Sequence, residues 1–435
     1  MFKRIIFIVL LVLWAGELPA QNRLSGISKI DSLTYAQYLK GDWNALIKTA
    51  EKARKNGVDF YYLDVRQGIA YYHLGKYRKA VVYLQKAYDA DEKNQVVAEF
   101  LYYSYVYAGR YLDARRVSDL FKLELKEKLG LLNNRLFEWG GIDFKIDFID
   151  DYSVDSQDDE LNQNVITDKK YIGFELYNYL GKADLMVLNA GKLYKDYTQY
   201  SVADGEQQAE RKSMTQTQYY LGYYSQIGTG WNLGFAVNWL RSNYDGIQYR
   251  MTGRGGNIRA VPVTQTINEW VGFAGLRRDM GNFKLGLTAS VSDLQEYLQL
   301  QPATEITWYP IGNSDLYIYS VATYKMEMQS GDWYNETVLK SGLGFRLAKI
   351  YWEPSYTYGN MYNFVEKDAL VVYNDNEKTT ARVNLLAYKF LMKGKLKIYA
   401  QYQWMSKTNY YQLNDTDQSI DYNNQSITTG ILWKF

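Results

Sequence analysis

The second half of the chain alternates apolar and polar residues over long stretches, and this pattern restricts the fold most strongly. In the last such stretch, one face holds Ile427, Thr429, Ile431, Trp433 and Phe435, and the even-numbered residues between them share the other face. Alternation with a period of two predicts β-strands that have one apolar and one polar face. A soluble β-sandwich alternates too, but its strands are usually shorter. Strands of ten or more residues that are rich in Tyr and Trp favour a transmembrane β-barrel.

From Trp139 to Phe435 the pattern predicts about fourteen antiparallel strands, and counts of about twelve to sixteen also fit the turn signals. Short turns alternate with long polar segments, as in barrels that turn tightly on the periplasmic side and carry long external loops. The external loops are expected at 153–168, 199–213, 245–262, 359–377 and 409–421. An even strand count returns the chain end to the side from which the barrel starts.

Composition excludes several classes of function. Lys plus Arg (50) nearly equal Asp plus Glu (48), so no basic footprint indicates a nucleic-acid partner. Cysteine is absent and His73 is the single histidine, so the barrel segment has no thiol or imidazole for catalysis. The acidic segment 150–160 lacks the spacing of a calcium-binding loop and is interpreted as a solvated external loop. We therefore expect no enzyme activity, no cofactor and no metal site.

The first residues have the pattern of an export signal. Lys3 and Arg4 precede an apolar run over 5–14, and Ala20 offers a small residue for cleavage before Gln21. The alternative is an uncleaved anchor helix, which the short apolar run disfavours. We predict a signal peptide at 1–20, a periplasmic domain at 21–138, and an outer-membrane barrel at 139–435 of a protein from a Gram-negative bacterium.

The periplasmic segment repeats every 34 residues. Gly41, Gly75 and Gly109 keep this spacing, and an aromatic residue follows each of them two positions later. This period is typical of tetratricopeptide repeats, which stack helix–turn–helix units. We predict about three repeats between residues 25 and 123, with a capping helix through 136, forming an α-helical solenoid. The residues expected to pack in it are Gly41, Trp43, Gly68, Tyr71, Gly75, Tyr77, Ala80, Ala87, Gly109, Tyr111 and Ala114.

Charged and amide residues fall on the polar parity of the predicted strands. Charges at membrane depth are tolerated in a barrel interior, so they indicate the wall of the lumen, and Glu269 and Arg277 set the parity of their own segment. The lumen candidates are Lys284, Glu305, Lys340, Arg346, Arg382, Lys395, Lys397, Tyr399, Gln401 and Gln403. Such side chains suit sugars, but they can equally pair across strands and plug a narrow barrel.

The architecture resembles known outer-membrane families. The C-terminal Trp433 and Phe435, with alternating apolar residues behind them, resemble the signal that the barrel assembly machinery reads. A repeat domain ahead of a barrel is similar to YaiO-like outer-membrane proteins and to the exporter porins for poly-N-acetylglucosamine. The resemblance implies outer-membrane lipid and lipopolysaccharide as surroundings, and a periplasmic protein or polysaccharide as partner of the repeats. The exporter has more repeats and a larger barrel, so the substrate does not carry over.

Two functions follow as hypotheses. In the first, the barrel is a conduit that exports a polysaccharide or another polymer, and the repeats recruit the polymer or its modifying enzyme. In the second, the barrel is a closed anchor, and the repeat groove scaffolds a periplasmic protein complex. A conduit predicts an open lumen and loss of export on charge reversal at Arg382, Lys395 and Lys397. A scaffold predicts a plugged lumen and indifference to those changes.

Overall fold

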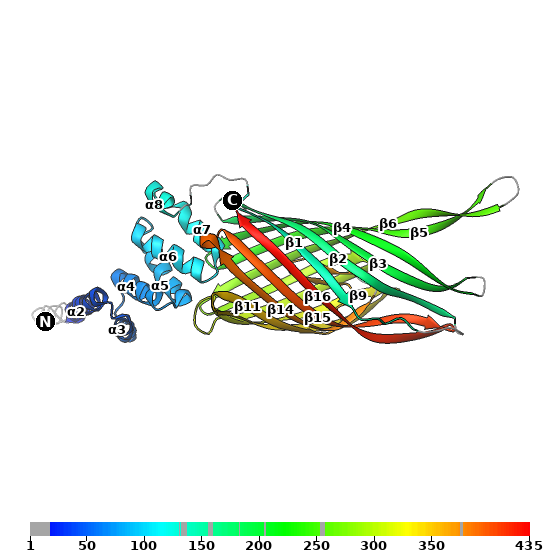
Figure 1. Cartoon of the computed structure of the whole chain (residues 1–435). Helices are drawn as coiled ribbons and strands as arrows, with labels where there is room; N and C mark the ends of the chain where they lie inside the picture. The colour runs from blue at the N-terminus through cyan, green and yellow to red at the C-terminus, as the bar shows by residue number, and fades with distance from the viewer. Residues whose placement is uncertain are drawn as a thin grey trace, which may run out of the picture. The chain divides into compact units, whose positions relative to one another are not determined.

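The computed structural model describes residues 18–129, 131, 137–154, 160–181, 183–203, 206–252, 257–374 and 377–435. They form two compact units, a helical unit and then a closed β-barrel (Figure 1). The predicted fold class, a helical repeat domain followed by a barrel, is confirmed. Residues 1–17 lie outside the described residues, so the export signal stays a prediction.

The helical unit is built from successive helical hairpins. Within the described residues its seven helices are α2 (Leu18–Lys40), α3 (Trp43–Lys55), α4 (Tyr61–His73), α5 (Tyr77–Ala90), α6 (Gln95–Tyr107), α7 (Tyr111–Asp119) and α8 (Leu123–Lys128). Helices α2 with α3, α4 with α5, and α6 with α7 are the three expected repeats. The short α8 stands where the capping helix is predicted, and residues 132–136 lie outside the described residues. In the described part of the chain, no helix combines the length and apolar character needed to cross a membrane.

The repeating glycines make the turns between paired helices. Gly41, Gly75 and Gly109 have φ angles of 67°, 70° and 76°. This left-handed conformation ends a helix at little cost only when the residue has no Cβ. The aromatic residue two positions later packs on the next repeat. Trp43 stacks on His73 with ring centroids 4.5 Å apart, and Tyr77 lies 4.7 Å from Tyr107.

Tyr111 is the equivalent aromatic of the last repeat, and it departs from the predicted packing role. Its side chain is 57% exposed, because no fourth repeat follows in the described residues to cover it. Burial lowers the pKa of the stacked His73 and so disfavours its charged form. In this position His73 packs between helices.

Small residues set the close approach of α4 and α5. A Cβ at Gly68 would lie 2.6 Å from the Leu84 side chain, which is fully buried. Ala80, Ala87, Ala114 and Tyr71 are buried in the same core. Apolar side chains therefore fill this unit. Burying apolar surface stabilises the folded state by roughly 25 cal/mol per Å².

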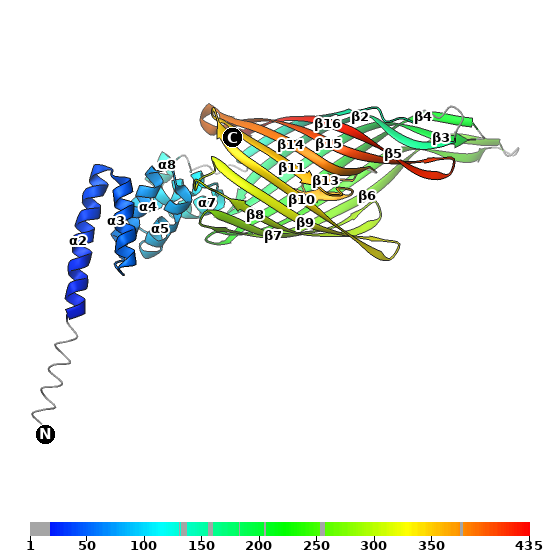
Figure 2. The same ribbon diagram turned by 90° about the horizontal axis from the view of Figure 1, so that it is seen from below.

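The second unit is a barrel closed by pairing of its first and last strands. Its fourteen wall strands, within the described residues, are β1 (Trp139–Ile149), β2 (Leu161–Leu180), β3 (Asp184–Ala203), β4 (Glu206–Gly228), β5 (Trp231–Thr252), β6 (Asn257–Met280), β7 (Phe283–Leu294), β8 (Tyr297–Trp308), β9 (Leu316–Gln329), β10 (Asp332–Leu347), β11 (Ile350–Tyr358), β14 (Lys378–Leu391), β15 (Leu396–Leu413) and β16 (Thr416–Lys434). Each pairs antiparallel with its neighbours, as β7 to β11 show side by side in Figure 2. The predicted count of fourteen is confirmed.

The alternation of the sequence becomes an apolar outer wall and a polar inner wall. On β16, Ile427, Ile431 and Trp433 are exposed outward, whereas Asn424 and Ser426 are buried inside. This arrangement is the reverse of a soluble core, and it is the architecture of bacterial outer-membrane barrels.

Four predicted loops are wrong in extent, because strands continue into them. In the predicted loop 153–168, residues 161–168 already belong to β2. Segment 199–213 is mostly β3 and β4, segment 245–262 is mostly β5 and β6, and segment 409–421 is mostly β15 and β16. Their polar side chains indicated loops, but a hairpin ladder is formed by backbone groups and continues in water without an apolar face. The predicted loop at 359–377 differs in another way, described below.

Several tyrosines have their rings on the inner wall of the barrel. The ring of Tyr399 lies over Gly430 on the next strand, and the ring of Tyr317 lies over Gly344 in the same way. Both rings occupy the space that a Cβ would fill. A Cβ at Gly344 would come within 2.0 Å of the Tyr317 ring. Glycine therefore makes room for inward aromatic rings, which line the lumen.

Candidate functional site

The segment between β11 and β14 folds into the barrel instead of forming an external loop. We call its described part, residues 359–374, the inserted segment. It contains a short hairpin of β12 (Phe364–Glu366) and β13 (Val371–Tyr373). Its residues contact side chains of inward parity on the wall, as the next paragraphs show. The lumen therefore contains part of the chain itself and is not bare at this level.

The inserted segment crosses the lumen from one side to the other. Tyr373 accepts a hydrogen bond from Arg382 on β14, and the amide of Asn374 donates to Gln216 on β4 over 3.0 Å. Strands β14 and β4 lie eight positions apart around the barrel in one direction and six in the other. The contacts of this one segment thus reach nearly opposite walls.

Two carboxylates at the hairpin tip bind cations of the wall. The guanidinium of Arg277 donates to both Asp368 oxygens, at 2.6 and 3.0 Å, and also to the Glu305 carboxylate at 2.7 and 2.8 Å. Glu366 forms ion pairs with Arg382 at 2.7 Å and Lys340 at 3.2 Å. Charge-assisted, bidentate contacts of this kind are the strongest polar contacts in proteins.

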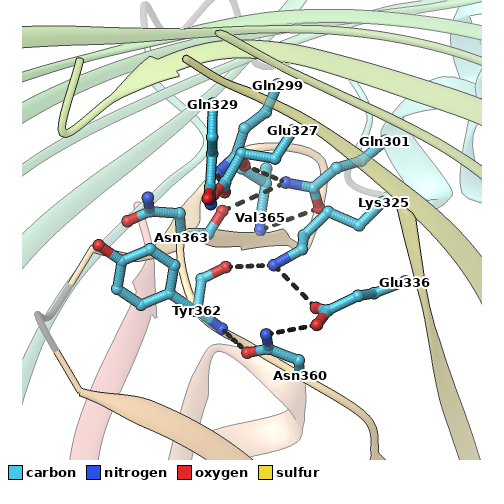
Figure 3. A network of polar contacts seen from close by, with 10 residues as sticks. All are labelled: Gln299, Gln301, Lys325, Glu327, Gln329, Glu336, Asn360, Tyr362, Asn363 and Val365. Carbon is cyan, nitrogen blue, oxygen red and sulfur yellow. Dashed lines mark hydrogen bonds and ion pairs between the residues drawn. The ribbon is translucent and has the colours of Figure 1, made fainter. Parts of the chain in front are cut away.

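A second network holds the first part of the inserted segment against β8, β9 and β10 (Figure 3). Lys325 donates to the Tyr362 carbonyl over 2.9 Å and pairs with Glu336 at 3.3 Å. The Gln301 side chain donates to the Asn363 carbonyl and accepts from the Val365 amide, at 3.3 and 3.2 Å. Wall side chains therefore satisfy backbone groups of Tyr362, Asn363 and Val365, whereas the first residues of the segment form backbone hydrogen bonds with β14.

Apolar contacts add to the polar ones. Val365 and Ala369 pack against Leu240, Val271 and Leu294 of the inner wall. Within the described residues, however, β12 and β13 form a separate two-stranded sheet that no ladder joins to the wall. The hairpin can therefore leave the lumen without any wall strand losing its ladder, and an isolated two-stranded hairpin is only marginally stable in water.

The predicted lumen residues are distributed unevenly over this site. Glu305, Lys340 and Arg382 form or share the ion pairs with the hairpin tip. Lys284 lies near Glu305, and Lys397 lies over the inward Tyr388 and Tyr399 rings. Gln401 and Gln403 follow on the same face of β15, with Gln403 buried.

Two of the predicted lumen residues lie at the barrel end. Lys395 is exposed in the turn between β14 and β15, because the short helix at Met392–Gly394 delays the start of β15 to Leu396. Its backbone carbonyl still accepts a hydrogen bond from the Lys434 amide of β16, over 2.7 Å, and its place in the lumen stays a prediction. Arg346 pairs with Asp315 at 3.3 Å, and both side chains are more than 40% exposed.

Sequence reasoning missed the residues supplied by the inserted segment, Glu366 and Asp368 above all. It also used Arg277 only to assign parity. The signal was present in the apolar residues Phe364, Val365 and 370–372, which an external loop in water does not need.

A groove of about 800 Å³ lies on the outer wall rather than in the lumen. Small residues, among them Ser320, Ala322 and Ser341, form its floor beside the exposed Leu287 and Leu339. These side chains have outward parity and face lipid, so the groove does not belong to the lumen. No cluster of three or more metal-ligating side chains occurs in the parts of the chain that the structure describes.

No family model and no curated protein matches this sequence. Solved structures with a similar barrel include a Pseudomonas aeruginosa FadL homologue, at 11% identity over 69% of this chain and 90% of that chain, with a TM-score of 0.44. The P. putida toluene transporter TodX gives 9% identity, coverages of 71% and 92%, and a TM-score of 0.42. The Acinetobacter baumannii outer membrane protein Omp33 gives 10% identity over 69% of this chain and 99% of that chain, with a TM-score of 0.33. The likeness extends to an outer-membrane-type closed barrel and no further.

Proposed function

We propose that this protein is a gated conduit of the outer membrane, closed at rest by the inserted segment and opened when that segment moves. The observation that carries the proposal is the separate β12–β13 sheet, which crosses the lumen without joining the wall ladder. A permanent plug could be joined to the wall by strand pairing. This hairpin is held by side chains, so solute or water can replace it without breaking the wall ladder.

The polar character of the contacts supports the same proposal. Ion pairs in a protein interior gain little net free energy, since desolvation opposes the attraction. When the hairpin leaves, water hydrates the separated charges again. The apolar contacts of Val365 and Ala369 with the wall oppose this exchange and hold the closed state.

The cargo and direction extend this proposal. Tyr399, Gln401 and Gln403 line the inner face of β15 and suit stacking and hydrogen bonding to a polysaccharide. We place the helical unit in the periplasm, where its repeats would recruit the polymer or a protein that handles it. Export, rather than uptake, rests on this placement.

The test is conductance of the purified full chain in a planar bilayer. A variant with residues 362–375 replaced by a short glycine–serine linker should conduct steadily, while the wild type should be closed with brief openings. The matched control replaces 408–420 at the tip of the β15–β16 hairpin by the same linker and should behave like the wild type. A folded 362–375 variant that does not conduct would overturn the proposal.

A closed anchor is the second candidate, and one observation favours it. Met361, Phe364 and Ala369 of the inserted segment are at most 3% exposed, as in a permanent core. If the linker variant conducts but the wild type never opens under any voltage, the anchor is the better account. The repeat surface would then carry the function as a scaffold for a periplasmic protein complex.

A further inference from the structure

We infer that the cargo of this conduit is anionic, carrying carboxylate or similar acidic groups. The inference rests on the proposed function, because it concerns what replaces the inserted segment in the lumen. In the closed state, the hairpin tip places the carboxylates of Glu366 and Asp368 on cations of the wall. A passing solute with acidic groups would take the same positions.

The wall cations depend on the hairpin for their charge balance. Among the described residues, Glu366 is the carboxylate that forms ion pairs with both Lys340 and Arg382. Arg277 keeps Glu305 as a partner when Asp368 leaves. The tip also carries Lys367 between the two carboxylates, so removal of the hairpin takes away one net negative charge and leaves Lys340 and Arg382 without Glu366.

The neighbouring network does not share this excess. Lys325 is paired with Glu336 of the adjacent wall strand, so this pair stays balanced after the hairpin moves. The wall cations that lose a carboxylate partner are thus Arg277, Lys340 and Arg382. A ring of cations in a pore selects anions, and the selectivity at the tip level should follow these three residues.

The first test is ion selectivity of the 362–375 linker variant in a potassium chloride gradient. We expect chloride to be preferred over potassium by a permeability ratio of roughly 3 or more, as charged rings in pores impose. Adding Arg277→Gln, Lys340→Gln and Arg382→Gln should bring the ratio to about 1 or below, since the ring is lost.

The matched control removes three positive charges from the outer wall. Lys192 and Arg241 are exposed on outward parity, and Lys389 pairs across the ladder with the outward Ile398. Lys192→Gln, Arg241→Gln and Lys389→Gln together should leave the permeability ratio unchanged. An equal fall in both triple variants would show that net charge, not the hairpin-binding cations, sets selectivity.

The second test uses the wild-type chain with poly-L-glutamate, dextran and poly-L-lysine as probes. Poly-L-glutamate should compete with Glu366 and Asp368 for the wall and raise the open probability severalfold, while dextran and poly-L-lysine should not. A linker variant that conducts but prefers potassium, or a wild type that responds to poly-L-lysine, overturns the inference that the cargo is anionic. It leaves the proposed gated conduit in place. A linker variant that does not conduct overturns the proposed function, and this inference falls with it.

Discussion

The helical unit and the barrel fill their interiors with opposite chemistry. Leu46, Leu63, Leu84 and Leu101 are completely buried in the helical unit. The barrel exposes many of its leucines outward, among them Leu287 and Leu339, and buries Arg382 and Glu366 inside. Loss of an apolar contact leaves a cavity that water does not fill, whereas loss of a polar contact leaves groups that water can hydrate.

This difference predicts different consequences of the same kind of mutation. Truncating an interior side chain of the helical unit should unfold it. Truncating an interior side chain that holds the inserted segment should open the lumen, because the wall ladder does not depend on it. The following changes test this contrast, beginning with the largest effect.

Arg382→Gln should open the barrel. The Arg382 and Glu366 side chains are 2% and 10% exposed, and removing one partner of a buried ion pair costs about 3–5 kcal/mol. Because 1.4 kcal/mol corresponds to a factor of ten in a population, the open probability should rise at least tenfold. Single-channel recording measures it. An unchanged open probability, or a barrel that fails to fold, would contradict the claim that interior changes in the barrel open the lumen instead of unfolding the wall.

Leu84→Ala should destabilise the helical unit by about 2–5 kcal/mol, as large-to-small changes in a packed core do. Thermal unfolding of the full chain, followed by loss of the helical circular dichroism signal at 222 nm, measures it. Val82→Ala on the same helix is the control, since Val82 is 52% exposed, and it should change stability by well under 1 kcal/mol. Conductance should be the same in both variants and in the wild type.

Arg346→Gln should have a small effect, under about 1 kcal/mol, because exposed ion pairs contribute little. Its partner Asp315 is as exposed as Arg346 itself. Unfolding of the barrel in urea with a fluorescence readout measures the change, and open probability should equal that of the wild type. A response as large as that of Arg382→Gln would mean that any lumen-parity cation controls opening.

The smallest effect concerns His73, whose pKa is lowered by burial against Trp43 and its neighbours. A group with a folded pKa below its unfolded value contributes stability above the unfolded pKa, near 6.5, and loses it as the pH falls below that value. As the single histidine of an untagged chain, it gives one imidazole signal in an NMR titration. A midpoint below 6.5 is expected, and a midpoint above 6.5 would contradict the packed position.

The sequence was informative where geometry follows from local periodicity. A 34-residue spacing of Gly41, Gly75 and Gly109 specified the helical turns, and alternation as in β16 specified strands and the lipid face. It was less informative about where segment 359–377 goes, because only a few apolar residues, Phe364, Val365 and 370–372, distinguish it from a solvated loop. The wall residues that receive Glu366 and Asp368 are brought together from distant strands, and local periodicity does not indicate which of them meet.

The most direct test of the central claim is to fix the hairpin to the wall. The chain has no cysteine, so Lys340→Cys with Glu366→Cys can be joined by a reducible thiol cross-linker, with each single variant treated alike as control. The account predicts that cross-linking of the double variant stops the openings and that reduction restores them, with no change in the single variants. Openings that continue after complete cross-linking would show that transport does not require movement of the inserted segment.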